Sequence, residues 1–272
     1  MIKNEHPQNH ERRNYLLFLL SSLAVVVIVP TLLTSAGSSM HQLARDRISV
    51  NDGRPLVVAA DTFEQKYGWI ITYEDPPFAH ESDLVDVTEK VRRDLDKFKP
   101  GQAPKVFSPK GGELTLEYDI DPVTQRPVNA DLVIQQLLDA YNIGKSGAFR
   151  MERSGERVHI IGTAAKNKEG VWTSHQSVLD AVITIPPQKR NGLTLLEAFC
   201  AAVSQASHTQ VQIGTVPMSL FARYQTEAGA KDQKARDFFV NEFDRMTGRA
   251  RLSWHLLYSA TMKSYYLNIH VV

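Results

Sequence analysis

The sequence predicts an α+β protein in which an N-terminal apolar helix precedes two tandem small modules of the β-α-β-β-α-β-β type. Three observations predict it. Residues 16–33 form an apolar run without charge, segments with strand and helix periodicity alternate after it, and their order recurs in the second half. We expect a signal peptide or membrane anchor over 1–40, a first module over 47–165 with an insertion near 80–112, and a second module over 176–272.

The N-terminal run has the features of an export or anchoring segment. Its roughly 18 residues lie between the length of a signal-peptide core and that of a minimal membrane span. Arg12 and Arg13 precede it, and the small residues 34–37 follow it, with Thr34 and Ala36 at possible cleavage positions. A cleaved signal and a retained anchor therefore both stay open. In either case the arginines keep the N-terminus cytoplasmic, which places the rest on the periplasmic side of the inner membrane or in the soluble periplasm.

The first module begins with a short strand at 48–50. Pro55 suits the first position of a helix, and Gly68 suits the residue that ends it. Aromatic and β-branched residues at 69–73 then indicate a strand. The later elements of this half are a strand at 112–120, a helix capped by Asn129 and ended by Gly144, and a hairpin of strands at 148–152 and 157–161.

Within the insertion, apolar residues at helical spacing predict a helix over 84–98, although residues 86–88 would also suit a strand. The polar stretch 166–170 is the expected seam between the modules.

The second module repeats this order. Thr194 and Glu197 form a capping-box pair that predicts the start of a helix. The remaining elements are a strand at 181–185, a strand at 211–213, a helix over 235–246 that Gly248 closes, and strands at 252–258 and 265–271.

The helix-then-strand units resemble the short N-terminal domains of secretins and TonB-dependent receptors. The matching stretches are 55–60 with 68–71, 195–199 with 211–213, and 131–141 with the hairpin at Ser154-Gly155. The resemblance covers residues 48–272 and implies protein–protein contact in the envelope without catalysis. That family's domain usually precedes an outer-membrane barrel, whereas no barrel pattern is present here. We therefore expect a free-standing or membrane-tethered module whose partner is another chain.

Charge and cysteine content exclude several classes of protein. The 272 residues include 31 Lys and Arg against 30 Asp and Glu, a formal charge of +1 that argues against a strongly basic nucleic-acid binder. The single cysteine excludes an internal disulfide and a multi-cysteine metal site.

The sequence predicts no catalytic, cofactor-binding or metal-ligating residue. Cys200 lies on an apolar helix stripe and reads as a core residue. His80 and Glu81 lack the second histidine of a zinc-binding helix motif, and no two histidines have ligand spacing on a convincing helix. The remaining candidates are interpreted as structural. Residues 144–146 are a helix end instead of a phosphate loop, Asp119 and Asp121 lie at solvated strand ends, and 145–168 is a solvated basic hairpin. His175, His255 and His270 are expected on the surface or on a strand face.

The C-terminal hairpin is rich in aromatic residues, namely Trp254, Tyr258, Tyr265 and Tyr266. One face is expected in the core, and the terminal strand is an alternative site for strand addition by a partner.

These observations predict a non-enzymatic envelope protein that acts as an interaction or adaptor module of a secretion, pilus or transport assembly. It would contact a protein partner and the inner membrane, with no nucleic acid and no cofactor. The alternatives are a periplasmic ligand-binding sensor and an unrecognised hydrolase. A hydrolase requires a concave pocket that holds several titratable side chains.

Overall fold

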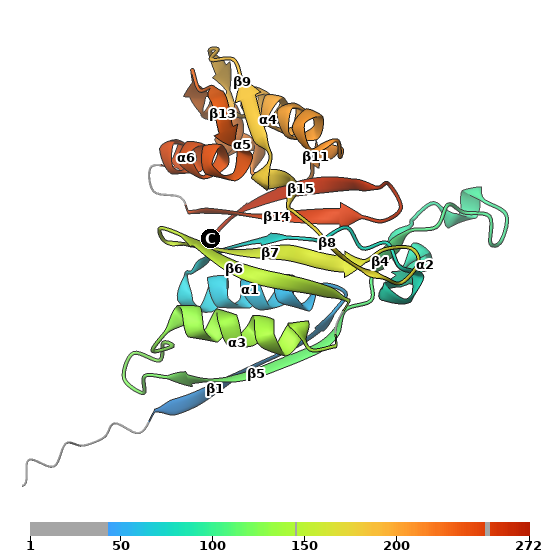
Figure 1. Cartoon of the computed structure of the whole chain (residues 1–272), viewed down its shortest axis with the longest axis vertical. Coiled ribbons are helices and arrows are strands. Elements are labelled where there is room, and N and C mark those ends of the chain that lie inside the picture. Colours follow the sequence, from blue (N-terminus) through green and yellow to red (C-terminus); the bar gives the residue numbers. More distant parts are fainter. Residues whose placement is uncertain (1–42, 145, 248–250) are drawn as a thin grey trace, which may run out of the picture. The chain divides into compact units, whose positions relative to one another are not determined.

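A seven-stranded mixed sheet runs through the middle of the chain (Figure 1). Strands from both halves meet where β2 pairs in parallel with β14, so that Tyr73 lies opposite His255 and Glu74 opposite Leu256. The order is β11 (Val211–Ile213), β15 (Ser264–Val271), β14 (Leu252–Ser259), β2 (Ile70–Glu74), β7 (Arg157–Lys166) and β6 (Gly147–Ser154), with β8 (Trp172–Ser174) added to the end of β7.

This computed structural model describes residues 43–144, 146–247 and 251–272. The six helices and several sheets within these ranges confirm the α+β class. The apolar run at 16–33 and the segment 1–40 lie outside the described residues. Within the described ranges, no helix has the length and hydropathy needed to cross a membrane.

One face of the sheet is covered by α1 (Pro55–Tyr67) and α3 (Ala130–Asn142), and strands β1 (Ala44–Asp52) and β5 (Gly112–Ile120) lie beyond these helices (Figure 1). The predicted start and end of α1 and the predicted N-terminal cap of α3 are confirmed. The predicted end of α6 at Gly248 lies outside the described residues. Pro55 is at the start of α1, and Gly68 ends it with a left-handed φ of 66° that costs glycine little. The Asn129 side chain accepts a hydrogen bond from the N–H of Leu132 at 3.1 Å.

The other face carries the elements of the second half. They are β9 (Val182–Ile185), β10 (Arg190–Asn191), α4 (Gly192–Ser207), α5 (Met218–Arg223), β12 (Gln225–Thr226), β13 (Ala230–Lys234) and α6 (Ala235–Thr247). The predicted cap at Thr194 is wrong. Asn191 caps α4 instead, because its side chain accepts a hydrogen bond from the N–H of Thr194 at 2.9 Å.

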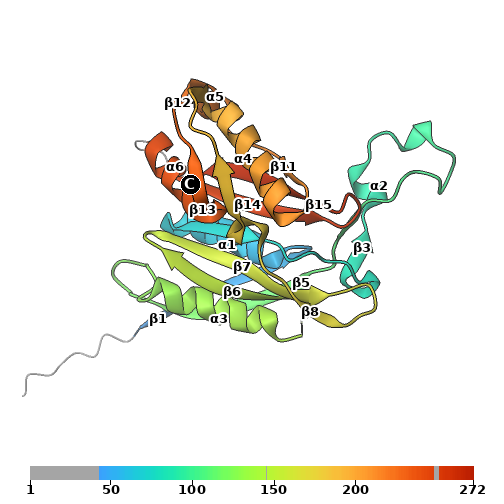
Figure 2. The same ribbon diagram turned by 45° about the horizontal axis from the view of Figure 1, so that its top comes forward.

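The predicted helix over 84–98 is also wrong. Strand β3 (Leu84–Asp86) pairs with β4 (Phe107–Pro109), and only a single helical turn, α2 (Thr88–Val91), follows. The Asp86 side chain accepts a hydrogen bond from the N–H of Thr88 at 3.0 Å and so ends the strand in a turn. This segment projects from the body (Figure 2) and buries few of its apolar residues, since Val85 and Val91 are exposed. The described residues also form short 3₁₀ helices, namely η1 (Glu81–Asp83), η2 (Leu95–Lys97) and η3 (Val178–Asp180).

Two separate hydrophobic clusters lie on the two faces of the sheet. One joins α1 and α3 to β1, β5 and the inner residues of β2, β6 and β7, with Phe63 and Leu137 fully buried. The other joins α4 and α6 to β9, β14 and β15 around Trp254. Each cluster draws its buried residues from one half of the chain. The stretch 166–170 forms a turn between β7 and β8, closed by a 2.9 Å bond from the N–H of Asn167 to the carbonyl of Val171.

Candidate functional site

Strands β1 and β5 form a two-stranded antiparallel ribbon of nine paired positions. Its inner face packs on α1 and α3 through Ile48, Leu114 and Tyr118, while the opposite face is solvent-exposed. Among the described residues, neither strand pairs with a third one, apart from an isolated bridge between Ile120 and Pro127. Unpaired strand edges present rows of backbone donors and acceptors that can take up another strand.

The exposed face of the ribbon separates charge between its two strands. Arg45 and Arg47 lie on β1, and Glu117 and Asp119 lie opposite them on β5. Arg45 is within 3.9 Å of Glu117 and 3.7 Å of Asp119, although its side chain is 74% exposed. Such open ion pairs stabilise little. Arg45 and Arg47 instead give β1 a basic outer face.

Asp46 fixes the ribbon to α1 from its inner face. Its Oδ2 accepts hydrogen bonds from the hydroxyls of Tyr67 at 2.9 Å and Tyr118 at 2.7 Å, and from Lys66. Burial raises the pKa of Asp46, but these bonds outweigh it and hold the pKa well below its usual range. The ribbon is therefore held firmly on its inner face while its edges stay open.

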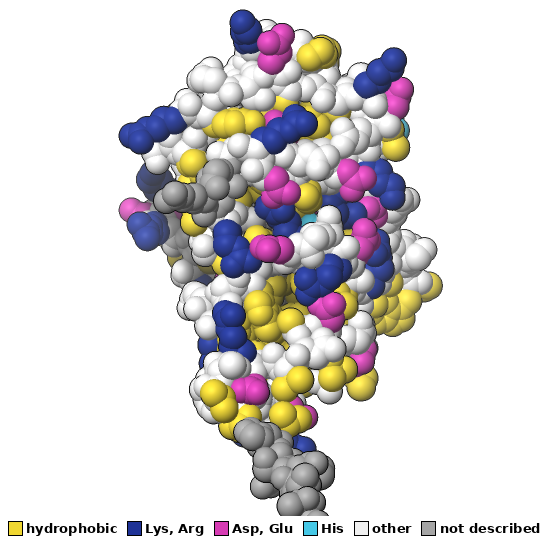
Figure 3. Space-filling view, turned by 90° about the vertical axis from the view of Figure 1, so that its left-hand side faces the viewer, with side chains coloured by type: hydrophobic (Ala, Val, Ile, Leu, Met, Phe, Trp, Pro, Cys, Tyr) yellow, Lys and Arg dark blue, Asp and Glu magenta, His cyan; other side chains and the backbone are white. Residues whose placement is uncertain are grey.

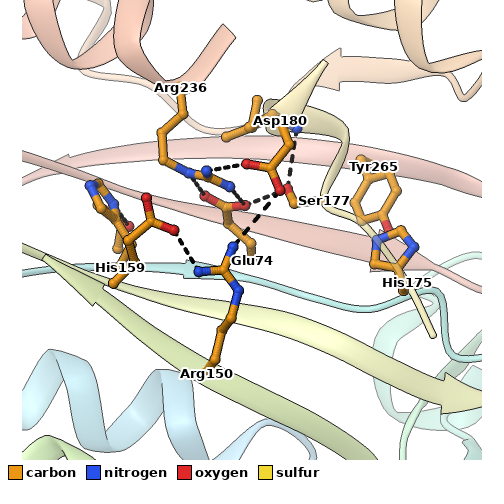
Figure 4. A network of polar contacts seen from close by, with 11 residues as sticks. Glu74, Arg150, His159, His175, Ser177, Asp180, Arg236 and Tyr265 are labelled. Atoms are coloured by element: carbon orange, nitrogen blue, oxygen red, sulfur yellow. Dashed lines mark hydrogen bonds and ion pairs between the residues drawn. The ribbon is translucent and has the colours of Figure 1, made fainter. Parts of the chain in front are cut away.

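A buried polar network lies on the opposite side of the sheet, between the two halves (Figure 4). Glu74 of β2 is fully buried and accepts two hydrogen bonds from Arg236 of α6, at 3.0 and 2.8 Å. Ser177 donates to the same carboxylate, and Arg236 also binds Asp180. The carboxylate and the guanidinium are therefore well partnered, and their hydrogen bonds join the two halves of the chain.

His159 lies at the edge of this network. Its side chain is fully buried, its Nδ1 lies 2.7 Å from the hydroxyl of Thr72, and its ring lies 5.4 Å from that of Trp254. Burial lowers the pKa of His159 to about 4. The imidazole is therefore neutral in the folded protein at neutral pH.

This lowered pKa predicts a loss of stability in mild acid. The unfolded chain takes up a proton near pH 6.5, whereas the folded chain takes it up near pH 4. The contribution of neutral His159 to the free energy of unfolding is therefore fully present above pH 6.5. It falls by on the order of 3 kcal/mol as the pH decreases toward 4. We expect His159→Gln, which can still bond Thr72, to flatten the fall in unfolding free energy measured by urea denaturation between pH 7 and 4. Parallel curves for the two proteins would contradict this.

The structure also places the residues considered from the sequence. Cys200 is buried in the second cluster, where burial raises the pKa of its thiol to about 12, consistent with an inert core residue. His80 bonds Ser82 at 2.6 Å, and His175 lies 3.2 Å from the Tyr265 hydroxyl. His255 and His270 face α1 with their ring centroids 4.7 Å apart, a proximity that their sequence spacing did not reveal.

The C-terminal strand does not offer the free edge that the sequence suggested. β15 is bonded to β14 on one side and to β11 on the other, with Val211 opposite Tyr265. Backbone bonds from Ile269 to Thr215 and from Tyr265 to Gln210 extend this cover. Among the described residues, the β1–β5 ribbon does keep edges that pair with no further strand.

On the face of the molecule seen in Figure 3, the described residues form no large patch of a single charge. Acidic and basic side chains are mixed there, with a histidine visible among them near the middle. Comparisons with protein-family models, with curated proteins and with solved structures find no match to this chain.

Proposed function

We propose that this protein is a non-enzymatic envelope module that binds a protein partner by strand addition at the β1–β5 ribbon. The observation that carries the proposal is the ribbon itself, nine pairs long, anchored on one face and with no third strand among the described residues. Strand addition obtains affinity from backbone bonds and specificity from alternate side chains. Such a module would serve as an adaptor in a secretion, pilus or transport assembly.

The basic face of β1 favours one kind of partner. A strand that adds to its outer edge places its side chains opposite Arg45 and Arg47, as β5 places Glu117 and Asp119 on the other side. Opposite charges across strands stabilise the pair, and like charges weaken it. The partner is therefore an extended segment with acidic side chains at alternate positions.

The sequence supports an envelope location. The apolar run at 16–33 with Arg12 and Arg13 before it is typical of an exported or membrane-anchored chain. Strand β1 begins at Ala44, shortly after that run, so a retained anchor would hold the docking ribbon near the inner membrane. The two hydrophobic clusters support the finer proposal of two tandem modules that resemble secretin-type N-terminal domains.

Charge reversal on the ribbon tests the proposed function. We expect Arg45→Glu with Arg47→Glu to lower recovery of the partner about tenfold in intact cells, because like charges then face each other. The measurement is in-cell crosslinking of C-terminally tagged full-length protein, with mass spectrometry of the captured species and of the crosslinked peptides.

Lys231→Glu is the matched control, since Lys231 is an exposed strand residue of the second half. Support requires that the control captures the partner like the unmodified protein and that the crosslinks map to an acidic extended segment. Equal capture by both variants would contradict the proposal, as would no capture above background by correctly exported protein.

A further inference from the structure

A cavity of about 440 Å³ lies between α1 and the C-terminal hairpin, away from the ribbon. Asp61 and Glu64 reach it from one turn of α1, and His255 and His270 reach it from β14 and β15. The strand register explains the pairing of the histidines: His270 lies opposite Ser253, two residues before His255, so both rings point to the same face of the sheet.

His255 has an unmet bonding requirement. The residue is 8% exposed, and its Nε2 has no hydrogen-bond partner among the described residues. The nearest opposite charge is Asp61, whose Oδ1 lies 3.3 Å from that nitrogen. Buried polar atoms are rarely left without a partner, so this nitrogen indicates a ligand at the cavity wall.

Glu64 holds the second histidine in place. One carboxylate oxygen accepts a hydrogen bond from the N–H of Ile71 at 2.9 Å, and the other lies 2.6 Å from His270 Nε2. Metal-bound imidazoles commonly have this arrangement, with one ring nitrogen on a carboxylate and the other on the ion.

We propose that Asp61, His255 and His270 bind a divalent transition-metal cation, with Zn²⁺ the best match, and that Glu64 orients His270. One ligand atom from each of the three residues lies within 4.8 Å of the others. Zinc bonds of about 2.0–2.1 Å place tetrahedral ligands roughly 3.3 Å apart, which is the separation between His255 and Asp61. Two imidazoles disfavour Mg²⁺ and Ca²⁺, which prefer oxygen ligands.

The geometry also determines how an ion reaches the site and what its binding would join. The side chains of Asp61 and His270 are 40% and 32% exposed, so the site is reachable from solvent. Three protein ligands leave a fourth position open to water or to a further ligand. Because α1 belongs to the first half and the histidines to the second, the ion would join the halves directly.

Titration of the full-length, chelator-stripped protein with Zn²⁺ tests the site by calorimetry, with Mg²⁺ as the control ion. We expect one Zn²⁺ per chain, and at least about tenfold weaker binding in Asp61→Asn and in His270→Gln. Asp237→Asn, which alters an exposed carboxylate at the start of α6, is expected to bind like the unmodified protein. Thermal unfolding provides a second readout, since Zn²⁺ should raise the melting temperature only where the ligands remain.

Zn²⁺ binding no stronger than Mg²⁺ binding would overturn the site. So would unchanged affinity in both ligand variants. The Asp61 side chain is partly exposed, so its conservative substitution leaves the fold intact, and the melting curve without metal verifies this. The test does not depend on the proposed docking, because neither ligand variant touches the ribbon.

Discussion

Substitution of Glu74 by Gln is expected to lower the free energy of unfolding by about 3–5 kcal/mol. The carboxylate is fully buried and receives two hydrogen bonds from Arg236 and one from Ser177. Its neutralisation leaves the guanidinium of Arg236, itself only 4% exposed, without its main counter-charge. Urea denaturation at pH 7 measures the change.

Asp131→Asn is the control for this experiment. Asp131 also pairs with an arginine, Arg153, but the two side chains are 44% and 38% exposed. Loss of that pair should cost less than about 1 kcal/mol, because water screens it. Equal losses for Glu74→Gln and Asp131→Asn would show that the buried network does not join the halves.

Substitution of Asp75 by Ala is expected to cost about 3 kcal/mol for a related reason. Asp75 is 2% exposed and accepts hydrogen bonds from Arg54 Nε at 2.7 Å, the Tyr73 hydroxyl at 2.7 Å and the Tyr258 N–H at 2.8 Å. Arg54 in turn donates to the carbonyl of Tyr258. The removal of one carboxylate therefore leaves three donors unsatisfied, two of them from the first half and one from β14.

Asp52→Ala provides the comparison. Asp52 also accepts a bond from Arg54, through the backbone N–H at 2.7 Å, but at an exposed position. We expect a loss of about 1 kcal/mol or less there. Thermal unfolding of both variants measures the difference, and a loss at Asp75 as small as that at Asp52 would contradict the assignment.

The local elements could largely be predicted from the sequence. Periodicity located α1, α3, α6 and the strands of both hairpins, because each buries one face of regular spacing. The short elements could not be found this way. β3 and β4 pair over only three positions, and α2 is a single turn, so each is too short to show a period.

The union of the halves in one sheet could not be predicted either. β2 and β14 are paired at two positions only and are distant in sequence, so no local signal reports their contact. In the sequence, Glu74 and Arg236 look like surface charges. In the structure each is buried because it pairs with the other across the two halves.

The candidate sites show the same limit. The sequence suggested strand addition at the C-terminal hairpin, but β11, a three-residue strand from elsewhere, covers that edge. The facing of His255 and His270 depends on the hairpin register, and their proximity to Asp61 depends on how α1 packs. The available signal was one histidine on each of two consecutive strands, His255 on β14 and His270 on β15.

Site-specific photo-crosslinking in intact cells tests the docking ribbon most directly. A photoreactive residue at Ser49 would lie on the exposed face of β1. The control is the same residue at Thr184, on the exposed face of β9. The two positions are matched because each hydroxyl bonds one cross-strand partner, Thr115 for Ser49 and Asp232 for Thr184. We predict an adduct from Ser49, mapped to an acidic extended segment of an envelope protein, that disappears with Arg45→Glu and Arg47→Glu. The same adduct from both positions, or none from Ser49 in exported protein, would contradict the proposed function.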